Sequence, residues 1–213
     1  MLKKNIDLYN EKYQNIDKDQ IERIKTYLKE SKFSEKDLKK FKSEFDRILN
    51  IDHEIFKIVI YGIPESTPRP RYNFNHGNFY VKNARSNNEF LKLVVDEEKD
   101  ILDKLVITPC ELTIKMYFPI PSNMSKVDTL LAEMGVIKPP INKDWDNLGK
   151  TYSDMIQKWL LLNDSLITKG TSEKYWSLKP RVEIYLDYLT EFDCKYNKKL
   201  VENSKLYQDS INK

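Results

Sequence analysis

Four charged side chains in one stretch of the chain could do chemistry together. Asp144 and Asp146 stand two residues apart, Lys150 follows four residues after Asp146, and Asp164 comes later. A carboxylate is costly to bury unless a cation or hydrogen-bond donors compensate its charge. These acids therefore either stay in water as a helix cap and an exposed Asp146–Lys150 pair, or they gather around a divalent cation. Spacing alone favours the first alternative, because such pairs arise easily in a chain with 33 acidic residues.

The second alternative would supply a definite chemistry. A divalent cation relieves the repulsion between neighbouring carboxylates, activates water and stabilises charge on a phosphoryl oxygen. A nearby lysine could stabilise the transition state or position the water. The chain has only two histidines and two cysteines, so its residues favour oxygen ligands, which suit Mg²⁺ or Mn²⁺ better than zinc. We expect both cysteines to be reduced.

A helix has to position these residues. Apolar residues recur at helical spacing over 148–162, and Asp146 or Asn147 is a plausible N-cap. Asp146 and Lys150 would then share a face, with Asp154 one turn further. Such a helix is about 22 Å long, so Asp164 returns to Asp144 only if the helix ends early or the next strand runs back beside it. We expect Trp145 and Trp159 to belong to the core.

The rest of the chain indicates an α/β or α+β fold, a small mixed sheet flanked by helices over residues 51–190. We expect strands near 56–62, 79–81 and 110–118, a closing pair over 165–176 and 181–189, and helices near 84–105 and 126–134. The strand at 110–118 should present one apolar face, made of Leu112, Ile114, Met116 and Phe118. Residues 1–50 lack glycine and proline and predict two or three helices, one starting at Ser34, as an N-terminal extension that is either solvated or an added contact surface. Residues 191–213 resemble a polar tail.

The charge distribution is more informative than its total. A net charge of +3 permits nucleic-acid binding without arguing for it. Basic residues concentrate in a loop-like, aromatic-rich region, where either phosphate contacts or a solvated loop would explain Arg69, Arg71, Lys82 and Arg85. No apolar run reaches the length of a membrane span, and the first residues lack a signal-like apolar core, so we expect a cytoplasmic protein.

The motif as a whole is more specific than its spacing. The run D-W-D-N-L-G-K over 144–150, followed by Asp154 and then N-D-S over 163–165, resembles the RusA family of Holliday junction resolvases. That family carries D-x-D-N-x-x-K, an aspartate four residues later and a final aspartate. The resemblance extends over roughly residues 55–188 and includes the Pro- and Arg-rich loop that begins at Gly62. Asn163 stands where members often have a second acid, and Leu166 where many have glutamine.

The resemblance implies an enzyme that resolves four-way DNA junctions. Family members are small homodimers that cut two strands of like polarity symmetrically, with Mg²⁺ or Mn²⁺. Carried over by motif, the metal ligands would be Asp144, Asp146 and Asp164, and Lys150 would be the catalytic lysine. Asp154 and Asn147 would support them. DNA contacts would come from Arg69, Arg71, Lys82, Arg85 and Lys143.

Two other functions remain open from the sequence. A non-catalytic junction-binding or recombination accessory protein on the same scaffold would be expected to have lost a ligand or the lysine, and this chain retains all of them. A phosphohydrolase acting on small nucleotides would call for a phosphate cradle, and no Gly-rich loop is present.

Overall fold

The computed structural model describes residues 17–66, 71–73, 78–80, 105–141, 143–157 and 160–190, with the backbone alone described for the two short segments within 71–80. The chain divides into two compact units, Met1–Asp52 and His53–Lys213. The helix expected near 84–105, the polar tail, Cys194 and Trp159 lie outside the described residues. None of the helices in the described ranges is long and apolar enough to cross a lipid bilayer.

The first unit contains two amphipathic helices, α2 (Lys18–Glu30) and α3 (Glu35–Leu49). Asp17 caps α2 by accepting a hydrogen bond from the backbone N–H of Gln20 at 2.6 Å. The start predicted at Ser34 is confirmed, because Ser34 and Asp37 form a reciprocal capping box at the head of α3. Within these two helices Leu49 is the one buried residue.

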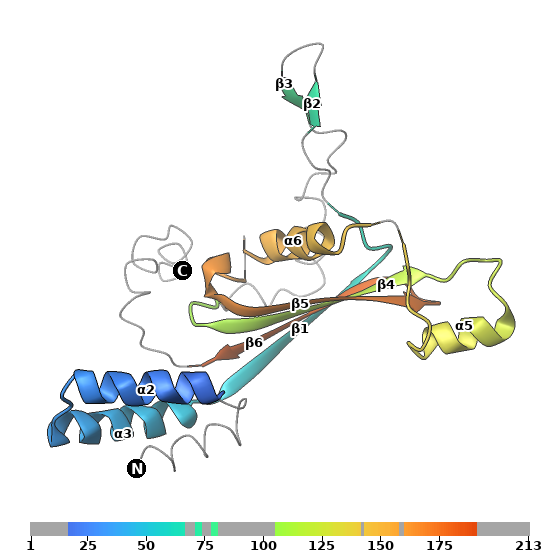
Figure 1. Ribbon diagram of the computed structural model, residues 1–213. Coiled ribbons are helices and arrows are strands. Elements are labelled where there is room, and N and C mark those ends of the chain that lie inside the picture. The colour runs from blue at the N-terminus through green and yellow to red at the C-terminus, as the bar shows by residue number, and fades with distance from the viewer. Residues whose placement is uncertain are drawn as a thin grey trace. The chain divides into compact units, whose positions relative to one another are not determined.

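The second unit is built on a four-stranded mixed sheet, as the sequence predicts (Figure 1). Its strands are β1 (His53–Tyr61), β4 (Cys110–Pro119), β5 (Ile167–Ser177) and β6 (Arg181–Leu189). Their order is β1-β6-β4-β5, with β4 and β5 parallel and the other neighbours antiparallel. The expected closing strands β5 and β6 therefore do not pair with each other but border β4 on its two sides. A separate two-stranded ladder joins β2 (Arg71–Asn73) to β3 (Asn78–Tyr80).

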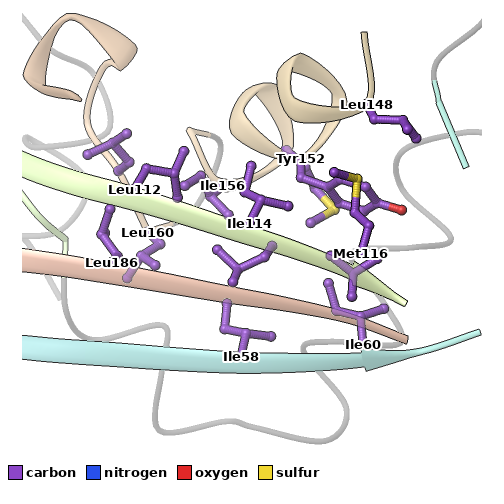
Figure 2. Packing of buried hydrophobic residues seen from close by; sticks show 14 of the residues in the cluster. Ile58, Ile60, Leu112, Ile114, Met116, Leu148, Tyr152, Ile156, Leu160 and Leu186 are labelled. Carbon is purple, nitrogen blue, oxygen red and sulfur yellow. The ribbon is translucent and has the colours of Figure 1, made fainter. Parts of the chain in front are cut away.

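One face of the sheet is apolar and is covered by α6 (Trp145–Ile156), as Figure 2 shows. The predicted apolar face of β4 is confirmed, since Leu112, Ile114, Met116 and Phe118 are all buried. They meet Leu148, Tyr152 and Ile156 of α6 in one core cluster. Burying each large side chain of this kind contributes about 1.5–3 kcal/mol. The helix expected near 126–134 is also confirmed, as α5 (Lys126–Glu133), which contacts β5.

The bounds of α6 differ from the expectation at both ends. Asp144, and not Asp146 or Asn147, is the N-cap residue, and its carbonyl accepts a hydrogen bond from Leu148 N at 3.1 Å. The helix ends at Ile156, and beyond it Leu161 forms an isolated parallel bridge with Val106. Val106 N donates to Leu160 O at 2.7 Å, and Leu162 N donates to Val106 O at 3.1 Å. The apolar pattern over 160–162 thus indicates burial correctly, but these residues form a turn and an isolated β-bridge beyond the helix.

Gly149 lets α6 approach β5 closely. It is buried, and a Cβ at this position would overlap Ser172 Oγ and lie 3.4 Å from Ser172 Cβ. Glycine inside a helix normally costs about 1 kcal/mol relative to alanine. The close contact explains the glycine, because a side chain here would have to displace the Ser172 hydroxyl or push the first turns of α6 away from β5.

A double-mutant cycle tests this contact. We expect Gly149→Ala to lower the free energy of unfolding of the native protein by at least about 1 kcal/mol more than it lowers that of the Ser172→Ala variant, in which the overlapping oxygen is absent. Free energies of unfolding from urea titration of the four proteins give the coupling. Equal effects of Gly149→Ala in both backgrounds would contradict the close-packing explanation.

Candidate active site

The start of α6, residues 144–146, presents two carboxylates to solvent, and we call it the acid turn. Asp144 is the N-cap residue and Asp146 lies in the first turn, and both are exposed. The partial positive charge of a helix N-terminus favours acids at such positions. Asp144 does not use its side chain to cap the helix. Lys150 follows one turn after Asp146 and is also exposed, so the helix period places this cation beside the acids.

Trp145 anchors this turn to the sheet. The residue was expected in the core, and that expectation is wrong: it is 55% exposed. Its indole Nε1–H donates a hydrogen bond to the backbone carbonyl of Ser172 at 2.7 Å. The side chain between the two acids therefore ties the helix start to β5 through a polar contact, with more than half of its surface left exposed.

A second set of contacts joins the acid turn to the segment that leaves β1. Lys143 Nζ donates to the carbonyl of Pro64 at 2.6 Å, and Lys174 Nζ donates to the carbonyl of Lys143 at 3.2 Å. Further along α6, the Tyr152 hydroxyl accepts a hydrogen bond from Glu65 N at 3.1 Å. Burial raises the pKa of the Tyr152 hydroxyl to about 12, so it stays protonated.

These contacts hold the first residues of the Pro- and Arg-rich loop, which begins at Gly62, against α6. Among the predicted DNA contacts, the structure describes only the side chain of Lys143, whose ammonium binds Pro64 and lies 5.4 Å from the Phe118 ring centroid. Arg71 is described by its backbone alone, as the first residue of β2. Arg69, Lys82 and Arg85 lie outside the described residues. The proposed DNA contacts of all five remain predictions.

Asp164 lies at the other end of α6. It opens a short 3-10 helix, η2 (Asp164–Leu166), in which Asn163 Oδ1 accepts a hydrogen bond from Ser165 N at 2.9 Å. The strand from there to Ser172, where Trp145 is anchored, covers about 17 Å. The helix ends early and the chain then returns beside α6. The part of the returning chain that reaches the acid turn is β5, however, and Asp164 lies before β5 in the sequence.

The donor chemistry of the three aspartates suits a hard divalent cation, because exposed carboxylate oxygens are what Mg²⁺ and Mn²⁺ prefer. Within one chain, however, the three aspartates do not come together as a metal site. Over the ranges that the structure describes, no three acidic, histidine or cysteine side chains lie close enough to hold a metal ion. Asp144 and Asp146 would provide part of a site, and the role of Asp164 remains a prediction.

The two supporting residues of the motif stay on α6. Asn147 is half-buried, and its carbonyl accepts a hydrogen bond from the Thr151 hydroxyl at 2.8 Å. Asp154 is exposed two turns beyond Asp146. Their assigned support of the site is not tested by these contacts and stays a prediction.

Sequence reasoning missed the partners that hold the acid turn. Ser172 receives both the indole of Trp145 and the bare backbone of Gly149, and Lys174 bonds the carbonyl just before the acids. The one available signal was Gly149, an unfavourable residue inside an otherwise regular helix. Its partner could not be identified without knowing that β5 runs beneath α6.

Comparison with known families identifies the chain. The model of the family described as endodeoxyribonuclease RusA matches residues 62–187, more than half of the sequence. A comparison with curated proteins gives no significant match. The matched segment contains β4, α5, α6 with its acid turn, Asp164 and β5. The chain therefore belongs to the RusA family of Holliday junction endodeoxyribonucleases.

Proposed function

We propose that this chain resolves four-way DNA junctions as a cytoplasmic homodimer, by paired symmetric hydrolysis that depends on Mg²⁺ or Mn²⁺. The observation that carries the proposal is the anchored first turn of α6, where Asp144 and Asp146 are exposed with Lys150 one turn away, inside the segment that matches the family. In this proposal Asp144, Asp146 and Asp164 bind the metal and Lys150 is catalytic.

The chain's own residues divide the work. The two acids of the helix start would bind the cation that the reaction needs, and Trp145 would keep them in place by fixing the turn to β5. The Lys150 ammonium would stabilise negative charge on the phosphate as it builds up in the transition state. When bound, the divalent cation activates the attacking water and stabilises charge on the leaving 3′ oxygen.

A dimer answers two requirements at once. A four-way junction has two equivalent strands to cut, and two equivalent sites related by a two-fold axis match that symmetry. Within one chain the length of α6, about 18 Å, separates Asp164 from the other two acids. A second copy would supply the missing carboxylate if Asp164 of each subunit faced the acid turn of its partner.

Removing one ligand should separate binding from cleavage. We expect Asp146→Asn to keep the fold and the junction affinity but to lower the single-turnover cleavage rate by at least about a hundredfold, because the amide no longer brings a negative charge to the cation. Asp46→Asn, an equal change at an exposed position of α3, is the matched control. Gel-shift and cleavage assays on a labelled four-way junction measure both quantities. Cleavage by Asp146→Asn at the native rate would refute the assignment of this ligand.

The anchor of the acid turn can be tested without touching a charge. Trp145→Phe keeps an aromatic ring but removes the donor to Ser172, so we expect a loss of about 0.5–1.5 kcal/mol in unfolding free energy. The cleavage rate at saturating protein should fall more than the junction affinity, because the acids on either side lose their fixed position. Urea unfolding and single-turnover kinetics measure the two effects. A stable variant with native kinetics would show that this bond does not position the acids.

A further inference from the structure

The face of the sheet turned away from α6 carries a row of aromatic and basic side chains. The register partners that cross all four strands on this face are Tyr61, Arg181, Tyr117 and Tyr175. The rings of Tyr117 and Tyr175 stack with centroids 5.2 Å apart, and the Arg181 guanidinium lies 3.7 Å from the Tyr117 centroid. This row contains no carboxylate.

Two lysines extend the row at its ends. Lys138 Nζ lies 3.8 Å from the centroid of the Tyr175 ring, and Lys179 Nζ lies 4.6 Å from that of Tyr61, which is 60% exposed. Both lysines are exposed. A ring face attracts a cation and holds the lysine stem along the surface, while the ammonium keeps its contact with solvent.

A similar arrangement recurs around Tyr185, four residues from Arg181 along β6. Lys57 and Lys115 flank the Tyr185 ring, with Nζ atoms 5.1 Å and 5.3 Å from its centroid. Lys57 reaches the carboxylate of Glu183 only at 4.0 Å. Four ammonium groups are thus held on this face by tyrosine rings instead of by close ion pairs.

Glu183 and Glu173 lie between the Arg181 row and the residues around Tyr185, and both carboxylates already have partners. Glu183 accepts hydrogen bonds from Arg181 Nε and from the Tyr185 hydroxyl, each at 2.6 Å. Burial alone would raise the pKa of Glu183, but these bonds outweigh it and lower the pKa. Glu173 accepts a hydrogen bond from the Tyr175 hydroxyl. The arginine therefore compensates the buried Glu183, and the lysine charges remain available to an outside anion.

We propose that this lysine–tyrosine face, made of Lys57, Lys115, Lys138 and Lys179 with Tyr61, Tyr175 and Tyr185, binds the sugar–phosphate backbone of a junction arm. It would do so on the side of the sheet opposite the acid turn, and this inference rests on the proposed function. Lysine binds phosphate as a point charge, and phosphate contacts supply affinity without reading sequence. The positive charge of the four ammonium groups is complementary to the negative charge of the phosphates.

A second copy of the chain fits this face less well. Lysine is depleted in the cores of subunit interfaces. A two-fold dimer that used this face would set like charges opposite each other, which is costly. We therefore assign DNA as its occupant and treat self-association as a result that would overturn the assignment.

The test compares two double variants with the same change in net charge. Lys115→Gln/Lys179→Gln removes two ammonium groups that rest on tyrosine rings. Lys25→Gln/Arg47→Gln removes two cations of the N-terminal helices, which already pair with Glu22 and Glu44 at 2.6 Å and 2.9 Å. Binding of a synthetic four-way junction is measured in EDTA over a range of salt concentrations, with thermal unfolding of each variant as a check of folding.

We expect the first double variant to bind several-fold more weakly than the native protein, with the slope of log affinity against log salt reduced by about 1–2. Its cleavage rate at saturating protein should stay native, which separates a failure of this face from a failure of the active site. The control double variant should match the native protein. Native affinity and salt slope in the first variant, or a change in its oligomeric state by sedimentation, would overturn the proposal. A native protein that binds no junction would overturn the proposed function as well.

Discussion

The position of the acid turn depends on how closely α6 lies on β5. Two contacts with Ser172 set that distance: the bare backbone of Gly149 lies against its side chain, and the Trp145 indole bonds its carbonyl. A side chain at position 149 would have to displace the Ser172 hydroxyl or the helix, and the second contact requires the indole N–H of Trp145 as its donor. Together they fix the turn that carries Asp144 and Asp146 while leaving both carboxylates exposed. A functional site built on a helix held by packing keeps its geometry better than one built on a loop.

The two faces of the sheet have different tasks because β-strands alternate their side chains. On one face, apolar residues of β1, β4 and β6 pack against α6 and hold the acid turn. On the other, tyrosine rings lie beside four lysines, and among the described residues only Lys57 of these four has a carboxylate within 4.0 Å. The sheet is thus both the support of the proposed active site and a basic surface. A branched DNA with four arms is a substrate large enough to reach both.

Much of the fold followed from local patterns, and most of the site geometry did not. Alternation in β4 and the capping box at Ser34 are local signals, and both were confirmed. The C-terminal end of α6 was misjudged because the bonds between Val106 and residues 160–162 join segments far apart in sequence. Trp145 was misjudged for the same reason, since its partner lies on β5. The lysine–tyrosine face could not be foreseen either, because its rows exist only once the strand order β1-β6-β4-β5 is known.

The most direct test of the account is cleavage of a labelled synthetic four-way junction beside a matched linear duplex, with Mg²⁺, Mn²⁺ or EDTA. The account predicts paired, symmetric nicks in the junction alone, present with either metal and abolished by EDTA. Tight junction binding without cleavage under any of these metals would contradict the catalytic role of Asp144, Asp146 and Lys150. Cleavage that persists in EDTA would contradict the metal dependence on which their proposed roles rest.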